Sequence, residues 1–214
     1  MFIPWSRGCG PWRPIWTNSG GQAIAEVLTG RVNPSGRLPV TFPERVEQLP
    51  HPEMPGFGTP PDTPTVVRYH EGAEVGYRWF HRTGVRPIFA FGHGLSYTRF
   101  DYADLRIEGG ETVTASFTVT NTGDRVGADV PQLYLTEAAG ERRIRLLAFE
   151  RVELHPGEAR RVELTAEPRL LACFDSAAGQ WRIADGPHRV MVGRAADAPV
   201  LTGKTSLEPR LFGR

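Results

Sequence analysis

The sequence lacks any large excess of charge, although its basic residues are unusually uniform. Its 25 lysines and arginines nearly balance its 24 aspartates and glutamates, and the formal net charge is +1. Lys204 is the single lysine, so arginine, a side chain well suited to phosphate, carries almost all of the positive charge. The arginines stand among acids, as in Glu141-Arg142-Arg143, which is typical of a solvated surface. We therefore expect no nucleic-acid partner and no anionic membrane surface.

Cysteine is scarce, and long apolar runs are missing. Cys9 and Cys173 are too few and too far apart to indicate a disulfide framework or a metal site, so we expect two separate thiols. No hydrophobic stretch approaches the ~20 residues of a membrane helix. Residues 1–5 (MFIPW) do not have the charged start and apolar core of a signal peptide. The compartment stays open between cytoplasmic and secreted as part of a longer parent protein.

Residues 86–100 (RPIFAFGHGLSYTRF) divide the chain into a first half rich in proline and glycine and a second half of alternating strand patterns. Five hydrophobic anchors are interrupted by two glycines that flank His93; the anchors are Ile88, Phe89, Phe91, Leu95 and Tyr97. Because glycine tolerates positive φ and close backbone approach, the stretch predicts a buried, sharply bent connector and not a regular helix or strand.

The first half contains the end of an α/β unit and a proline-rich connector. Residues 1–19 carry three tryptophans and three prolines without periodicity and are unassigned. Residues 20–30 place Ala23, Ile24, Val27 and Leu28 on one helical stripe that ends at Gly30. A turn at residues 33–36 and a short strand at residues 38–42 follow. Prolines crowd residues 44–65 and predict an extended connector. Residues 66–80, with alternating large residues from 75 to 80, then indicate a strand or hairpin arm.

The second half predicts an antiparallel β-sandwich. Residues 112–120 alternate hydrophobic and hydroxyl side chains, which is typical of a strand with one buried face. Further strands are expected at residues 130–135, 146–154, 162–165, 181–183 and 190–192, separated by Gly, Pro and Asn turns. Strands spaced by about ten residues predict roughly seven strands in a sandwich at 101–200, followed by a C-terminal tail at 201–214.

Several motifs, in this order, give the chain a family resemblance. They are GGQAIAEVLTG (20–30), NPSGRLPVTFP (33–43), YHEG (69–72), VGYRWF (75–80), FGHGLSYT (91–98), VTNTG (119–123) and VPQLYL (130–135). Together they resemble the C-terminal portion of the family 3 glycoside hydrolases, which include many β-glucosidases and β-xylosidases. The resemblance covers about residues 20–194, whereas residues 1–19 do not resemble the sequence that precedes the helix of residues 20–30 in the family. It implies the tail of an α/β sandwich domain at 20–43, a connector and hinge at 44–100, and a fibronectin type III-like domain at 101–200.

The resemblance also implies where the family's chemistry lies. Members begin with a (β/α)8 barrel that carries the aspartate nucleophile, and an α/β sandwich loop supplies the general acid/base. Neither region has a counterpart in this sequence. We therefore expect a fragment, a truncated product or a mis-started frame that is inactive alone, with no catalytic residue, cofactor or metal of its own. Its partners would be the missing barrel and sandwich domains, and the whole enzyme would hydrolyse a β-glucoside or oligosaccharide with retention.

The remaining side chains of chemical interest give weak signals. Retaining glycosidases need two carboxylates ~5–5.5 Å apart. Carboxylates in irregular positions are Glu53, Asp62, Glu71 and Glu74, and none stands in a catalytic motif; Glu71 is expected to close a turn with Gly72. The six histidines are His51, His70, His81, His93, His155 and His188, and no pair has helical ligand spacing. For His93 we favour a packed ring bonded to backbone carbonyls over a ligand or base. Ser35 and Ser96 lack the context of a nucleophilic serine.

Aromatic residues leave a second class of function open. Tyr77, Trp79, Phe57 and Tyr69 offer faces for pyranose rings, but large aromatics in an alternating pattern usually serve as packing anchors, which we favour for Tyr77 and Trp79. The alternative to a glycosidase fragment is a stand-alone carbohydrate- or protein-binding β-sandwich module, because this fold hosts many functions. A decayed remnant without function is the third possibility. We expect residues 101–200 to fold autonomously and residues 20–100 to be poorly protected.

Overall fold

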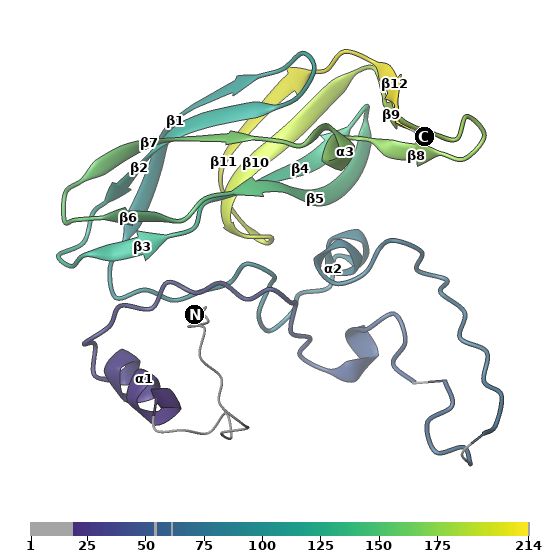
Figure 1. The fold of residues 1–214 in the computed structure, drawn as a ribbon, viewed down its shortest axis with the longest axis horizontal. Helices are drawn as coiled ribbons and strands as arrows, with labels where there is room; N and C mark the ends of the chain where they lie inside the picture. The colour runs from purple at the N-terminus through teal and green to yellow at the C-terminus, as the bar shows by residue number, and fades with distance from the viewer. Residues whose placement is uncertain (1–18, 54, 61, 214) are drawn as a thin grey trace, which may run out of the picture.

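The computed structural model describes residues 19–53, 55–60 and 62–213, and Figure 1 shows a β-sandwich with the preceding chain laid along one side of it. That preceding chain holds helix α1 (Ser19–Leu28), the 3-10 helix η1 (Val46–Gln48) and helix α2 (Tyr77–Thr83). Everything after residue 100 is predominantly β-structure, in agreement with the mainly β fold class expected from the sequence. Cys9 and nearly all of the unassigned stretch 1–19 lie outside the described residues.

Two antiparallel sheets form the sandwich, with three and four strands. The first has the order β1-β2-β7, with β1 (Phe100–Glu108), β2 (Thr114–Asn121) and β7 (Ala159–Thr165). The second has the order β11-β10-β4-β5, with β11 (Ala198–Ser206), β10 (Pro187–Ala195), β4 (Gln132–Ala138) and β5 (Glu141–Phe149). These two sheets agree with the predicted sandwich of roughly seven strands, although the strand predicted at residues 181–183 lies outside both of them and β1 and β11 were not among the predicted strands.

Smaller elements extend the ends of the sandwich. Strands β3 (Gly127–Asp129) and β6 (Val152–Leu154) pair at one end. Helix α3 (Pro168–Leu171) and a small sheet of β8 (Cys173–Asp175), β9 (Gln180–Ile183) and β12 (Arg210–Phe212) lie at the other. Strand β11 runs through residue 200 and β12 lies beyond it, so paired strands continue into the stretch that the sequence analysis treated as a tail.

The core follows from alternation along the strands. In β2 the side chains of Ala115, Phe117 and Val119 have no exposed surface, whereas the threonines and serine between them are partly exposed. The opposite sheet contributes buried residues such as Leu133 and Val190. Because successive side chains of a strand point to opposite faces, this alternation alone decides which face closes the core.

One strand expected from the sequence is divided in two. Residues 146–154 were expected to form one strand, but β5 ends at Phe149 and β6 begins at Val152. The two strands pair in different sheets, β5 with β4 and β6 with β3. Glu150 and Arg151 interrupt the run of hydrophobic residues at the point where the chain crosses between the sheets, and Phe149, next to the crossing, is exposed.

The arginine-rich surface is paired with acids, as expected from the sequence. Strand β10 presents Arg189 to Glu137 of β4 at 3.0 Å, and Arg160 lies 3.2 Å from Glu158. These pairs are largely solvent-exposed, so each contributes little to stability. Cys173 carries a free, exposed thiol. No helix in the described ranges is long and apolar enough to cross a membrane.

The chain before the sandwich is held by antiparallel backbone contacts instead of a regular sheet. The Leu38 amide donates to the His93 carbonyl at 2.8 Å, and the Gly92 amide donates to the Leu38 carbonyl at 2.8 Å. Farther along, Phe42 and Phe89 form an isolated bridge. The strand expected at residues 38–42 is thus reduced to a single bridge, because the partner segment bends at Gly92, where φ is +83°.

The expected strand or hairpin arm at residues 66–80 is wrong at its end, where the structure has helix α2. Gly76, with φ +55°, begins the helix, and Gly84, in the left-handed region, ends it. Tyr77 and Phe80, three residues apart, lie on one helical face, and α2 packs on β5. An alternation over only six residues is also compatible with a short helix, and tertiary packing decided between the two.

The hydrophobic anchors of residues 86–100 are less buried than expected. Ile88 is 58% exposed and Leu95 is 70% exposed, while Phe91 is half-buried. No described element covers Ile88 or Leu95. The predicted bend is present, but the prediction that its anchors are buried is wrong for this chain.

The buried histidine of β10 makes the stability of the sandwich depend on pH. His188 is fully buried, its Nδ1 lies 3.0 Å from the Gly186 carbonyl oxygen, and its Nε2 has no partner. Burial lowers the pKa of the imidazole below its ordinary value of 6.5, the Gly186 carbonyl opposes this, and the charge of Arg143 adds to it. The folded chain therefore holds His188 neutral where the unfolded chain binds a proton, so stability falls as the pH drops below 6.5.

We expect the urea midpoint of unfolding to decrease when the pH is lowered from about 7.5 to about 5.5. The decrease should be smaller in His188→Leu than in the wild type. The exposed His155, changed to leucine, is the matched control and should leave the pH dependence as it was. His81 also has a lowered pKa, caused by burial and then by Arg142, so some pH dependence should persist in His188→Leu. Equal slopes for the wild type and His188→Leu would contradict the assignment.

Candidate functional site

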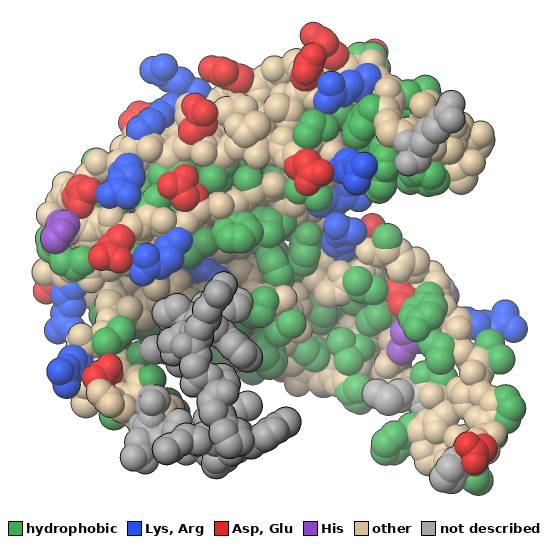
Figure 2. Space-filling view, viewed as in Figure 1, with side chains coloured by type: hydrophobic (Ala, Val, Ile, Leu, Met, Phe, Trp, Pro, Cys, Tyr) green, Lys and Arg blue, Asp and Glu red, His purple; other side chains and the backbone are tan. Residues whose placement is uncertain are grey.

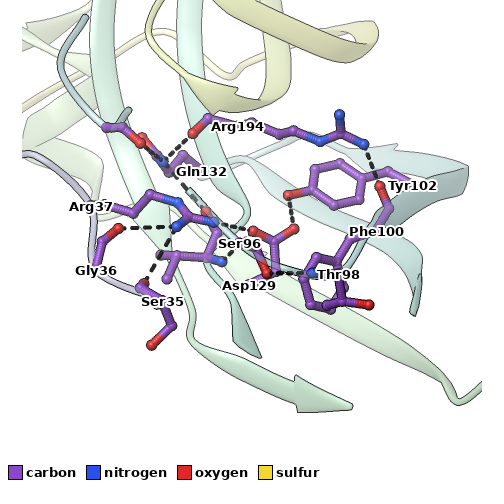
Figure 3. A network of polar contacts seen from close by, with 12 residues as sticks. Ser35, Gly36, Arg37, Ser96, Thr98, Phe100, Tyr102, Asp129, Gln132 and Arg194 are labelled. Atoms are coloured by element: carbon purple, nitrogen blue, oxygen red, sulfur yellow. Dashed lines mark hydrogen bonds and ion pairs between the residues drawn. The ribbon is translucent and has the colours of Figure 1, made fainter. Parts of the chain in front are cut away.

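A network of buried polar side chains joins the preceding chain to the sandwich (Figure 3). At its centre Asp129, at the end of β3, is 1% exposed. Its carboxylate forms an ion pair with Arg37, accepts the Tyr102 hydroxyl at 2.7 Å and accepts the Val130 amide at 2.9 Å. Burial and then the charge of Asp129 raise the pKa of Tyr102, so its hydroxyl remains a donor. Three segments distant in sequence therefore meet on one carboxylate.

Asn33 makes a second connection within the same junction. Its side-chain oxygen accepts the Ser96 hydroxyl at 3.1 Å and the Tyr97 amide at 2.8 Å. Its side-chain nitrogen donates to the Val126 carbonyl at 3.1 Å. The Tyr97 hydroxyl donates to the Val27 carbonyl at 2.8 Å, which fastens α1 to the hinge. Ser96 is thus a structural hydroxyl, consistent with its lack of a nucleophile motif.

Gln132, at the start of β4, makes the third connection. Its amide nitrogen donates to the Arg194 carbonyl at 2.8 Å and the Gly92 carbonyl at 3.2 Å, and its oxygen accepts the Tyr134 hydroxyl at 2.5 Å. The Arg194 guanidinium in turn donates to the Phe100 carbonyl. The side chains of Asp129, Asn33 and Gln132 are engaged within the protein, so the junction is a structural joint and not an open binding site.

A different cluster lies at the base of the proline-rich connector. His51 Nε2 lies 2.9 Å from Glu71 Oε2, and the Glu71 side chain is 3% exposed. His70 stands beside them, with its ring centroid 4.7 Å from that of His51. Glu71 does close a turn with Gly72, as expected, and the hydrogen bond from its own backbone amide and then His51 lower the pKa of the Glu71 carboxyl. An ionised, buried carboxylate therefore faces two imidazoles.

The other carboxylates and histidines named from the sequence remain apart from this cluster. Glu53 and Asp62 are exposed on the connector, and Glu74 follows Glu71 in the same turn. His93 packs its ring on Phe89, with centroids 5.2 Å apart, and no described hydrogen bond involves its ring nitrogens. The expected bonds from that ring to backbone carbonyls are therefore not found. His155 is exposed in the turn before β7.

The aromatic candidates divide into two pairs. Tyr77 packs on Phe91, with ring centroids 4.8 Å apart, and accepts the Leu146 amide on its hydroxyl at 3.1 Å. Trp79 donates its indole N–H to the Gln48 carbonyl at 2.8 Å. Both are packing anchors, as favoured from the sequence. Phe57 and Tyr69, by contrast, are 85% and 73% exposed on the connector.

Sequence reasoning missed the meeting of His51 with His70 and Glu71. Helical ligand spacing does not connect these residues, because 18 residues of irregular chain separate His51 from His70. The bend of the proline-rich segment brings its two ends together, and no local pattern carries that information. The one available signal was that His70 and Glu71 are adjacent in a motif shared with a family.

Family models match both halves of the chain. The model described as glycosyl hydrolase family 3 C-terminal domain matches residues 12–97, and the one described as fibronectin type III-like domain matches residues 129–196. The first match starts within the stretch 1–19 that the sequence analysis left unassigned.

Two curated proteins similar to this chain are β-glucosidases. Probable β-glucosidase I of Aspergillus oryzae is 38% identical over 208 residues, which are 90% of this chain and 24% of that protein. Thermostable β-glucosidase B of Acetivibrio thermocellus is 35% identical over 189 residues, which are 85% of this chain and 24% of that protein. The chain therefore spans about a quarter of the length of these relatives.

Solved structures give the same result. The structure of β-glucosidase 3B from Thermotoga neapolitana in complex with glucose has a TM-score of 0.81 and 40% identity, covering 91% of this chain and 27% of that one. The structure of β-glucosidase from Kluyveromyces marxianus in complex with glucose has a TM-score of 0.79 and 30% identity, covering 91% and 24%.

Proposed function

The chain belongs to the C-terminal region of glycoside hydrolase family 3, and from this premise we propose that it works as the docking and stabilising part of a β-glucosidase. In this proposal it completes an α/β sandwich domain through residues 20–100 and carries the fibronectin-like sandwich on the outside. The enzyme as a whole hydrolyses β-glucosidic bonds with retention, using carboxylates from protein regions that correspond to the remaining three quarters of its relatives.

The distribution of exposed hydrophobic side chains carries the proposal. Most of them lie between residues 24 and 97, and Figure 2 shows hydrophobic side chains along the segments below the sandwich. Among the described residues outside that range, the large exposed hydrophobics are Val126, Phe149, Phe174, Val200 and Leu211. We name the set between residues 24 and 97 the apolar face. A concentration of exposed hydrophobic side chains in one part of a chain is typical of a surface that another protein covers.

The carboxylates of the chain support a non-catalytic role. A retaining glycosidase needs one carboxylate as nucleophile and another as acid/base. Glu71 is the buried carboxylate of the connector, and it is engaged with His51, while Glu53 and Asp62 stand exposed without such a partner. The partner proposed for the apolar face is accordingly the rest of the parent enzyme, and the substrate proposed for that enzyme is a β-glucoside.

An activity assay of the purified chain tests whether catalysis depends on the rest of the parent enzyme. We expect no hydrolysis of an aryl β-glucoside or an aryl β-xyloside above the buffer rate, because the proposal places both catalytic carboxylates in the parts of the parent enzyme outside this chain. Measurement of released phenol, with host glycosidases removed, is sufficient. Turnover that disappears in Glu71→Gln would contradict the proposal and place catalysis within these residues.

A chimera tests the docking role directly. The matching C-terminal part of Thermotoga neapolitana β-glucosidase 3B is replaced by this chain, and hydrolysis and the melting temperature are measured. Leu28 and Ile88 belong to the apolar face, and each change to serine should remove about 1.5–3 kcal/mol of burial free energy. Leu211→Ser, on β12 of the small sheet, is the matched control and should have little effect. Equal effects of all three changes would contradict a docking role for the apolar face.

The alternative module hypothesis predicts a different result. A carbohydrate-binding module would bind a β-linked disaccharide as the isolated chain, and the exposed Phe57 and Tyr69 would be the side chains to test. Calorimetric titration with cellobiose separates the two functions, because the docking proposal expects no heat of binding from the chain alone.

A further inference from the structure

We propose that His51, His70 and Glu71 form a binding site for a divalent transition-metal ion of the zinc type, which clips together the two ends of the connector loop at residues 52–69. The three side chains each offer one ligand atom, and these atoms all lie within 4.8 Å of one another. The inference concerns this chain alone and is independent of the proposed glycosidase role.

The geometry is close to that of a metal site. Zinc binds imidazole nitrogen and carboxylate oxygen at about 2.0–2.2 Å, which places neighbouring ligand atoms of a tetrahedral site about 3.3–3.6 Å apart. His51 Nε2 and Glu71 Oε2 are 2.9 Å apart, so they must separate slightly to admit an ion. His70 is exposed, and its ligand atom already lies within 4.8 Å of the other two.

The donor set selects the kind of ion. Two imidazoles and one carboxylate suit Zn²⁺, Co²⁺ and Ni²⁺, whereas Ca²⁺ and Mg²⁺ prefer sites made of oxygen ligands. The His51 side chain is 25% exposed, so solvent reaches the cluster and water is available for a fourth position. Two histidines with one glutamate and a water is a ligand set that zinc uses in proteins.

The carboxylate is held in place before any ion arrives. Glu71 sits in a turn in which the Gly72 amide donates to the Tyr69 carbonyl at 3.3 Å and the Glu74 amide donates to the Glu71 carbonyl at 3.2 Å. Tyr69 also meets the His51 ring edge-on, with centroids 6.2 Å apart. A buried ligand with a fixed backbone lowers the ordering cost of binding, as a pre-organised site should.

The position of the cluster in the chain suggests what the ion does. His51 precedes the loop at residues 52–69, and His70 and Glu71 follow it. Among the described residues of the loop, the backbone bonds are local, such as Thr59 to Gly56 at 3.2 Å, and nearly all side chains are exposed. An ion held at both ends removes conformations from the open loop, and this effect stabilises the closed one.

Calorimetric titration of Zn²⁺ into the untagged, metal-stripped chain tests the site. We expect one ion per chain with a dissociation constant of about 1 μM or tighter, and a loss of at least about tenfold in affinity for His51→Ala and for His70→Ala. His155→Ala, which removes an exposed histidine of the sandwich, is the matched control and should bind as the wild type does. Far-UV circular dichroism establishes that each variant keeps its fold.

Limited proteolysis gives a second measurement, which does not depend on the heat of binding. Arg68 is exposed within the loop and directly precedes Tyr69, and trypsin cleaves the peptide bond after Arg68. Zinc should slow this cleavage several-fold in the wild type and leave the rate unchanged in His51→Ala. Equal zinc affinity in His51→Ala, His70→Ala and wild type, or zinc that binds without slowing cleavage at Arg68, would overturn the proposal and show adventitious binding elsewhere.

Discussion

Replacing Asp129 with alanine is expected to lower the free energy of unfolding by about 3–5 kcal/mol, the usual cost of breaking a buried ion pair from one side. The Arg37 side chain is 13% exposed, and without the carboxylate its charge is left almost buried and unpaired. The Tyr102 hydroxyl and the Val130 amide lose their acceptor at the same time. Because one substitution removes all three interactions, it should lower the free energy of unfolding more than most single substitutions do.

Urea unfolding of the purified chain, followed by tryptophan fluorescence, measures the effect. Glu153→Ala is the matched control, because Glu153 pairs with Arg151 at 3.4 Å and both side chains are more than half exposed. An exposed pair of this kind contributes less than about 1 kcal/mol. If Asp129→Ala and Glu153→Ala shift the midpoint equally, the buried network does not hold the two halves together.

Gly92→Ala should be nearly as damaging, for a reason of shape. At φ +83° an alanine costs about 1–2 kcal/mol in backbone strain. Its Cβ would also overlap the amide oxygen of Gln132 and lie 2.8 Å from that side chain's carboxamide carbon. Displacing Gln132 leaves buried polar groups unsatisfied, at about 1–3 kcal/mol. The sum of both effects should appear in the urea midpoint.

Gly157→Ala separates the two contributions. Gly157 has φ +74°, and nothing lies within 4 Å of the Cβ that an alanine would add there. This variant therefore reports backbone strain alone, and the difference between the two variants reports the clash with Gln132. If Gly157→Ala is as destabilising as Gly92→Ala, steric contact at the junction plays no part.

Much of the sandwich could be predicted from the sequence because its information is local. The alternation of Phe117 and Val119 with threonines identifies β2 without reference to any partner strand. Helix α1 is equally local, with its apolar stripe ended by Gly30. Helix α2 was mistaken for a strand because packing of Tyr77 on β5, and not its own sequence pattern, selects the helix.

The junction and the histidine cluster could not be predicted, because both are meetings of distant residues. Arg37 and Asp129 are 92 positions apart, and no local sequence pattern around either residue predicts that they pair. His51 and Glu71 are 20 positions apart across a proline-rich segment whose path follows no period. Composition described that segment as extended, whereas the structure folds it back on itself.

The bridge between Phe42 and Phe89 closes the base of a long excursion of the chain. The backbone leaves this bridge at residue 43, makes its excursion through the connector loop and α2, and returns to the same place. Length can therefore be gained or lost within the loop at residues 52–69 without shifting α1, the junction or any strand of the sandwich. In evolutionary terms this loop is the place where insertions are tolerated, while residues 33–42 and 88–98 are constrained to keep their length.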